Sequence, residues 1–365
     1  MTRLKKGNVV LLVGTSKGGF ILRSDARRKT WAVEGPLFAG LMVHHFTLDP
    51  RDGETFYAAT YSEWWGCDIQ RSRGGSKWHR TKGGVRYEPD AGLSVKCVWH
   101  IHPGNASEPG VVYAGVDPAG LFRSKDSGVT WTEVKGLNRH ESRNRWMPGK
   151  GGMILHSIVP DPHDARKMHI AISAAGVFYT EDGGATWQPR NRGTRADFMP
   201  DKYPDLGQCV HKLLPAPGGN SLYQQNHCGV YRSDSGGERW KDISKGLPSR
   251  FGFCMGVHPR EAGTAWVVPM ESSQFRACPD GKLSAYRSRD GGRSWQRAAK
   301  GLPERNAHLL VLREAMSVDS ADSAGVYFGT STGQLFHTRD EGSSWNLMAD
   351  YLPPIYSVEA FGPQA

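Results

Sequence analysis

The chain has 365 residues, a formal net charge of +10, 45 glycines and 12 tryptophans. This composition favours short strands and tight turns over helices. No apolar run is long enough to span a bilayer, and the basic residues alternate with acidic ones instead of forming the stripe typical of nucleic-acid-binding proteins. We therefore expect neither a membrane nor a nucleic acid as partner.

The N-terminal segment has basic residues followed by a short apolar run, and it lacks a small-residue cleavage site. Val9 to Val13 is predicted as a strand, and we expect a cytoplasmic protein. The six cysteines contain no Cys-x-x-Cys pair, which argues against a zinc ribbon or a thioredoxin-like motif. Buried free thiols are the expected state of most of them.

One ten-residue pattern recurs along the chain. An aromatic residue is followed at fixed offsets by Ser or Thr, Asp, Gly and Trp. Full copies occupy residues 122–131, 178–187, 286–295 and 336–345, with a weaker copy at 231–240 and worn copies at 21–31 and 69–78. The marker tryptophans are Trp31, Trp78, Trp131, Trp187, Trp240, Trp295 and Trp345. Their spacing suits one four-stranded propeller blade per repeat.

The pattern has a direct physical interpretation. An aromatic residue ends a strand, Asp and Gly form a hairpin turn, and Trp opens the next strand. The carboxylate can accept backbone N–H bonds inside the turn, and the indole fills the seam beside it. We interpret these aspartates as structural rather than catalytic.

The pattern resembles the Asp-box, or BNR, repeat of sialidases, sortilin-type receptor domains and photosystem II assembly-factor propellers. The resemblance covers nearly the whole chain and implies a propeller, but it does not select an activity. The chain lacks the Arg-Ile-Pro triplet of sialidases and has seven repeats instead of six, so a true sialidase is not expected. We predict a single all-β domain over residues 1–365, a seven-bladed β-propeller with four-stranded antiparallel blades.

Ring closure is also predicted from the ends of the chain. Only two strands, Val9–Gly14 and Gly19–Arg23, precede the first marker tryptophan, so the first blade lacks an inner strand. The C-terminal segment 355–361 has the pattern of that strand. We expect it to complete the first blade, which removes an open edge.

The functional site is expected on the face opposite the Asp-box turns. The longest loops, residues 61–67, 138–152, 190–207 and 271–282, belong to that face, and long ordered loops are commonly functional. Another polar segment, residues 223–228, is placed between two strands of its blade. Arginines, carboxylates and aromatic residues around one mouth predict a pocket for a small molecule.

The first hypothesis is a hydrolase of the glycosidase-like type, acting on a small anionic or sugar-like substrate. Two carboxylates would act as acid and base, or as acid and nucleophile, and histidines would move protons. The predicted catalytic residues are Glu271, Asp197, His156, His211 and His227. The predicted substrate-binding residues are Arg145, Trp146, Arg195, Gln225 and the further carboxylate Glu314.

A third hypothesis, after the binding propeller described below, is a metalloenzyme. Alignment of the inner strands on the turns that follow them places His44, Cys97, His156, His211 and Phe253 around the axis, together with His308 and Ser357. Neutral imidazoles are common ligands of zinc and copper. A divalent metal (Zn or Cu) at His44, His156 and His211 is one interpretation, and histidines that fill the seams between blades are the other.

Glu359 is the only charged residue of the next aligned layer. If it is buried, desolvation raises its pKa unless a cation pairs with it. It is thus either an acid or a structural partner of Arg313. The second hypothesis for the whole chain is a binding or assembly propeller with a protein partner and no chemistry.

Overall fold

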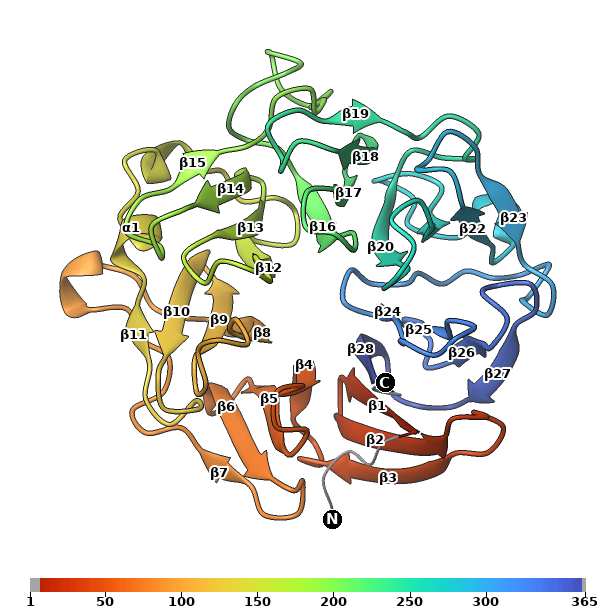
Figure 1. Ribbon diagram of the computed structural model, residues 1–365, viewed down its shortest axis with the longest axis horizontal. Helices are drawn as coiled ribbons and strands as arrows, with labels where there is room; N and C mark the ends of the chain where they lie inside the picture. Colours follow the sequence, from red (N-terminus) through yellow and green to blue (C-terminus); the bar gives the residue numbers. More distant parts are fainter. Residues whose placement is uncertain (1–6, 363–365) are drawn as a thin grey trace.

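The computed structural model describes residues 7–362, which form seven four-stranded antiparallel sheets arranged in a ring (Figure 1). This confirms the predicted all-β, seven-bladed propeller. Helix in the described residues is limited to α1 (Lys135–Asn138) and the 3-10 turns η1 (Pro89–Ala91), η2 (Arg143–Arg145) and η3 (Pro279–Gly281). No described helix has the length and apolarity that a membrane span requires.

Each blade runs from an inner strand beside the axis to an outer strand at the rim. Blade 1 consists of β28 (Ile355–Phe361), β1 (Asn8–Thr15), β2 (Gly18–Asp25) and β3 (Ala32–Leu37). Blades 2 and 3 consist of β4 (Met42–Leu48), β5 (Thr55–Ser62), β6 (Gly66–Arg73) and β7 (His79–Arg80), then β8 (Cys97–Pro103), β9 (Val112–Asp117), β10 (Gly120–Ser124) and β11 (Thr132–Glu133). Blades 4 and 5 consist of β12 (Ile154–Pro160), β13 (Met168–Ser173), β14 (Gly176–Thr180) and β15 (Gln188–Pro189), then β16 (Val210–Pro215), β17 (Leu222–Asn226), β18 (Gly229–Ser233) and β19 (Lys241–Asp242). Blades 6 and 7 consist of β20 (Gly252–Val257), β21 (Ala265–Pro269), β22 (Ala285–Ser288) and β23 (Gln296–Ala298), then β24 (Met316–Val318), β25 (Val326–Gly329), β26 (Leu335–Thr338) and β27 (Asn346–Ala349).

The two ends of the chain meet in blade 1, as predicted. Strand β28 pairs antiparallel with β1, with Leu12 opposite Glu359 (Figure 1). The inner strand of blade 1 therefore comes from the C-terminal end, and the ring has no open edge at this point.

The two faces of the ring differ. Within a blade, the first turn and the third turn lie on the same face because the strands alternate in direction. Backbone bonds join these turns, for example from Gly183 N to Arg166 O at 2.8 Å and from Gly236 N to Asn220 O at 2.9 Å. We call this side the turn face, and the opposite side, which carries the loops between blades, the loop face.

The repeated aspartates stabilise the third turn of their blades. In blade 3, Asp126 Oδ1 accepts the backbone N–H groups of Val129 and Thr130 at 3.0 and 2.9 Å, and Oδ2 accepts the Thr130 hydroxyl at 2.6 Å. The same Oδ2 contact recurs at Asp182, Asp290 and Asp340. The structural interpretation of these carboxylates is confirmed.

Three marker tryptophans join neighbouring blades. The indole N–H of Trp240 donates to Arg190 O at 2.8 Å, and that of Trp295 donates to Ile243 O at 2.7 Å. The indole of Trp345 reaches Ala298 O at 2.8 Å. Each carbonyl belongs to the preceding blade, so these residues close the seams as predicted.

Two of the expected loop-face segments are different in the structure. Residues 61–67 form a tight hairpin instead of a long loop, because β5 and β6 pair as far as Ser62 and Gly66. Residues 222–226 form strand β17, and only His227 and Cys228 make a turn. The strand was missed because three of its five residues are polar, although all five are buried.

The carboxylate of each repeated turn should stabilise the fold in a pH-dependent way. Hydrogen bonds from Thr186 lower the pKa of Asp182 to about 2. We expect Asp182→Ala to lower the free energy of unfolding by ~1 kcal/mol, a small value because the turn is exposed. Since the folded pKa is below the ordinary value, the stabilisation is complete above pH ~4 and is lost as the pH falls through about 2.

Urea unfolding at pH 7 and at low pH measures this difference. The weaker repeat supplies a matched control, because Ser235 occupies the aspartate position and its hydroxyl accepts the Arg239 N–H at 3.2 Å. Ser235→Asp should raise stability by a similar amount. Equal stability of Asp182→Ala and the unaltered protein at pH 7 would contradict the assignment.

Candidate functional site

β-bulges in the inner strands bring side chains to the axis. The pairing of β4, β8, β12 and β16 with the next strand skips one residue each. The skipped residues are His44, Trp99, His156 and His211. A bulge redirects the side chains around it. Because each bulge lies near the start of its strand, these residues lie toward the loop face.

His44, His156 and His211 occupy equivalent positions in their strands, as the alignment predicted, but the alignment is wrong in β8. The bulge residue of β8 is Trp99, where Cys97 was expected. The alignment assumed that every proline follows its strand, but Pro103 still pairs with Val112 inside β8. In β28 the pairing skips Tyr356 and not the expected Ser357.

Aromatic and cationic side chains contact one another in this layer. The His44 ring stacks on Trp99 and Tyr356, with centroids 5.0 and 5.3 Å apart. The Arg313 guanidinium lies 5.9 Å from the ring centroids of both Trp99 and Phe253. His44 is therefore held between two aromatic rings, and Arg313 stacks on aromatic rings of two other blades.

A cluster of charged groups fills the next layer toward the turn face. Glu314 Oε2 accepts a hydrogen bond from Lys212 Nζ at 2.5 Å and lies 3.3 Å from His100 Nδ1. His45 Nε2 lies 3.2 Å from Glu359 Oε1 and 4.0 Å from Glu314 Oε2. We call these five residues the axial cluster.

Most of the axial cluster is removed from solvent. Lys212, Glu314 and His45 are 5%, 2% and 1% exposed. Each residue of the cluster comes from a different blade. Glu314 precedes β24 of blade 7 and forms a parallel bridge with Ser357 of β28 in blade 1. Buried charges are costly unless they are paired, so this grouping is either structural or functional.

Hydrogen bonds indicate which ring nitrogen of His45 carries the proton. The backbone N–H of Ile101 donates to His45 Nδ1 at 3.3 Å. The ring proton therefore lies on Nε2, from which it is donated to the Glu359 carboxylate. His45 links the two adjacent blades and leaves neither nitrogen free. Glu359 is thus the partner of His45, and not of Arg313 as one interpretation expected.

Neighbouring groups lower the pKa values of the two carboxyl groups, and burial lowers the pKa of His100. Burial acts to raise the pKa of Glu314, but Lys212, His100 and His45 outweigh it and hold the pKa well below its ordinary range. Burial likewise acts to raise the pKa of Glu359, and its hydrogen bond with His45 makes the net shift downward. Burial lowers the pKa of His100 to about 4. At neutral pH the cluster thus holds two carboxylates and a neutral His100.

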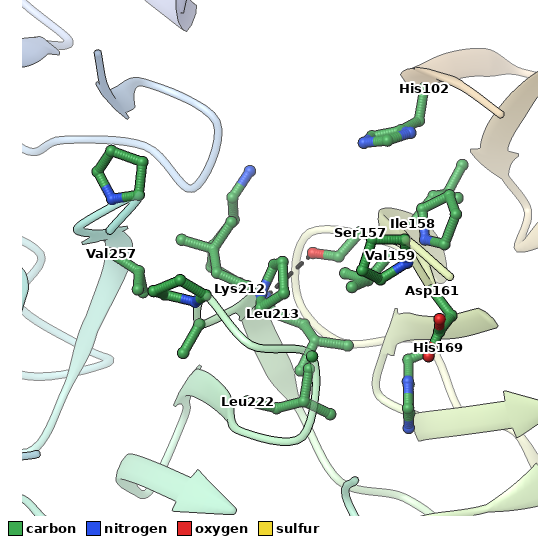
Figure 2. Close-up of a pocket in the computed structure, with 18 of the residues that line it drawn as sticks. His102, Ser157, Ile158, Val159, Asp161, His169, Lys212, Leu213, Leu222 and Val257 are labelled. Atoms are coloured by element: carbon green, nitrogen blue, oxygen red, sulfur yellow. Dashed lines mark hydrogen bonds between the residues drawn. The ribbon is translucent and has the colours of Figure 1, made fainter. Parts of the chain in front are cut away.

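A cavity of about 650 Å³ adjoins the axial cluster. His100, His102, Lys212 and Glu359 line its inner end, and the turns after β12, β16 and β20 form its walls. Figure 2 shows Lys212 and His102 extending from different inner strands toward the space between them. The cavity opens on the turn face, whereas the sequence predicted the central pocket on the loop face. Side chains after the bulges, and not the long loops, line this volume.

His100 is the member of the axial cluster best placed to act on a ligand. Its Nδ1 lies 3.3 Å from Glu314 Oε2 without the geometry of a hydrogen bond, and no described residue forms a hydrogen bond with its Nε2. His100 is buried and lines the cavity, so a ligand in the cavity would lie beside its ring. The arrangement places a carboxylate beside an imidazole, as in acid–base sites where the carboxylate stabilises the protonated ring.

The predicted catalytic carboxylates lie elsewhere. Glu271 and Asp197 are exposed on the loop face, and Asp197 forms an ion pair with Arg195. Arg145 is exposed on a neighbouring loop. Of the carboxylates selected from the sequence as catalytic or substrate-binding, only Glu314 lies on the axis.

Two predicted substrate-binding residues have structural roles instead. Trp146 is only 5% exposed, packs in the core and donates its indole N–H to Ser142 Oγ at 2.9 Å. The Gln225 amide donates to the carbonyls of Asn226, Gly229 and Arg250. The indole N–H of Trp146 and the amide N–H groups of Gln225 are thus bonded within the protein.

The predicted metal site is not formed by the expected histidines. Among the described residues, two groups place three ligand atoms within 4.8 Å of one another. They are His45, His100 and Glu314, and Cys209, His211 and His227. His156 is excluded because its Nε2 bonds Val210 O and its Nδ1 bonds Ser157 Oγ, while His44 is stacked between aromatic rings.

Sequence reasoning missed Lys212, His45, His100 and His102. One signal was present: His100 and His102 alternate along an inner strand, so they share a face. Lys212 follows the bulge residue His211 in β16. Its position toward the axis can be inferred only after that bulge has been located.

Comparisons with known proteins place the chain among propellers. No family model matches it. A xyloglucanase of Acetivibrio thermocellus is 25% identical over 289 residues, 69% of this chain and 32% of that protein. The chain thus spans about a third of the length of such a relative.

Solved structures agree on the fold. The GH74 xyloglucanase of Xanthomonas campestris superposes with a TM-score of 0.65 at 17% identity, over 99% of this chain and 53% of that one. The structure described as YCF48 bound to D1 peptide has a TM-score of 0.55 at 15% identity, over 92% and 93% of the two chains. These similarities are to seven-bladed propellers.

The buried ion pair predicts an asymmetric mutational response. Lys212→Met should lower the free energy of unfolding by about 3–5 kcal/mol, because it leaves Glu314 buried without its main counter-charge. The double variant Lys212→Met with Glu314→Gln should recover most of this loss, since no buried charge then lacks a partner. Urea unfolding of both variants measures the difference. Equal stability of the single and double variants would show that the two groups are not coupled.

Proposed function

We propose that the protein is a glycosidase-like hydrolase that acts on a small sugar-like ligand in the axial cavity. The observation that carries the proposal is that His100 lines the cavity while its Nδ1 lies 3.3 Å from the Glu314 carboxylate. A carboxylate on one ring nitrogen orients the imidazole and stabilises it when it takes a proton at the other nitrogen.

Each step of the proposed hydrolysis has a group in the cavity. His100 takes a proton from water as the water oxygen bonds to the anomeric carbon. The glycosidic C–O bond breaks, and the leaving oxygen receives a proton from the Lys212 ammonium group. The ionised Glu359 carboxylate stabilises the positive charge that develops on the sugar ring.

The relatives support this choice of reaction class. The sequence similarity is to xyloglucanases, and the Asp-box resemblance also includes glycosidases. Since the chain spans only part of those enzymes, we do not assign it their polymeric substrate. A cavity of about 650 Å³ is in the range that holds small ligands.

A cytoplasmic location is part of this proposal. All six cysteines are free in the structure, and five of them are buried. Free thiols fit a reducing compartment.

A second candidate function is binding of a protein on the loop face. Several large apolar side chains are exposed there, including Trp64, Trp65 and Tyr351 at 88%, 82% and 93%. Exposed aromatic residues are enriched where proteins bind partners. The YCF48 structure, which has a similar fold, is described as peptide-bound.

Substitution of His100 tests the hydrolase directly. A panel of chromogenic aryl glycosides identifies a turned-over substrate, and kcat and KM are then measured for the variants. We expect His100→Gln to lower kcat by ~10²–10⁴-fold with little change in KM, because it removes a general base.

The control is His79→Gln, which changes an exposed imidazole on the outer strand β7 and should retain full activity. Full activity of His100→Gln, or absence of turnover across the panel together with stoichiometric capture of one protein through the loop face, would favour the binding propeller.

A further inference from the structure

We propose that Cys209, His211 and His227 bind a zinc ion at the loop-face end of the channel, with the fourth position open. The Cys209 Sγ lies 3.5 Å from His211 Nε2, and the ligand atoms of all three residues lie within 4.8 Å of one another. Thiolate sulfur and imidazole nitrogen are both zinc ligands, and catalytic zinc sites use three protein ligands and an open fourth position. This site is separate from the axial cavity on the turn face.

The backbone holds the three ligands in place before any metal binds. Cys209 and His211 flank the first residue of β16, and His227 lies in the turn between β17 and β18. The backbone N–H of His227 donates to Cys209 O at 2.9 Å. Ligands on paired strand ends keep their spacing, which favours metal binding.

Hydrogen bonding leaves the correct nitrogen of His211 free. Its Nδ1 donates to Gly252 O at 2.6 Å, so the Nε2 lone pair points toward Cys209. A hydrogen bond from the distal nitrogen to a carbonyl is the usual support of a metal-binding histidine. His156 occupies the same bulge position in the preceding blade, but it has both nitrogens bonded within the protein.

Aromatic rings surround the two imidazoles. Phe251 lies 5.4 Å from the His211 ring and 5.1 Å from the His227 ring, and Phe198 packs on His227 at 5.2 Å. An apolar shell of this kind strengthens the interaction between a thiolate and a metal ion.

Two arginines affect the charge of the site. Arg276 and Arg313 both lie over the ring of Phe253, at 5.3 and 5.9 Å, and Phe253 stacks on His211 at 4.7 Å. Because these cations oppose a further positive charge, we expect the metal to bind with the Cys209 thiolate and with an anion at the open position.

The other group of potential ligands is a weaker candidate. In the axial cluster, the ammonium group of Lys212 lies 2.5 Å from Glu314 and supplies the cation at that position. No such cation is bonded to Cys209, His211 or His227 among the described residues.

Cobalt substitution tests the proposal. Tag-free full-length protein is stripped of metal under reducing conditions and titrated with Co²⁺ and then with Zn²⁺. We expect one equivalent of Co²⁺ to give a thiolate-to-cobalt charge-transfer band, which Zn²⁺ displaces. Cys209→Ser should abolish the band, and His227→Gln should weaken Co²⁺ binding by at least ~10-fold.

Matched controls are Cys67→Ser and His79→Gln, which change a thiol and an imidazole outside the site and should keep the band. His227 is half-buried in a turn, so His227→Gln is informative even where Cys209→Ser fails to fold. Absence of the band in the unaltered protein, or its persistence in both site variants, would overturn the proposal.

Discussion

The buried carboxylate of Glu314 is the constraint on which the centre of this propeller depends. It contacts Lys212 and His100 directly and approaches His45, and these partners come from three different blades. Breaking a buried ion pair of this kind costs several kcal/mol. The cluster can form only when the ring is closed, since β28 supplies Glu359 and lies beside the segment that carries Glu314.

Bulges in the inner strands separate two kinds of chemistry along one axis. The bulge residue itself lies toward the loop face, where His211 joins Cys209 and His227. The residue after it, such as Lys212 or His100, lies one layer further toward the turn face and lines the cavity. The bulge residue and the residue that follows it thus contribute to different sites, one at the loop-face end of the axis and one at the turn-face end.

The fold was predictable because its signals are local. The Asp–Gly turns and marker tryptophans recur at fixed offsets, and their hydrogen bonds lie within one turn or one seam. Ring closure followed from the missing inner strand of blade 1. These features do not depend on the exact pairing of the inner strands.

The site was predictable only in part, because it depends on register. The alignment of β8 on Pro103 was wrong by two residues, because it placed Cys97 where the structure has the bulge residue Trp99. A bulge changes the register within a strand, and the sequence alone does not locate it. Trp146 and Gln225 have the residue types of a binding site, yet packing and carbonyl contacts use them in the core. Burial depends on contacts between distant segments, which a residue type alone does not show.

The most direct measurement of the central claim is nitrogen NMR of imidazole-labelled protein, with His100→Gln used to assign the His100 signals. The arrangement beside Glu314 predicts a neutral His100 ring at pH 7 with its proton on Nδ1 and an unprotonated Nε2. A doubly protonated ring, or a neutral ring with its proton on Nε2, would contradict the account.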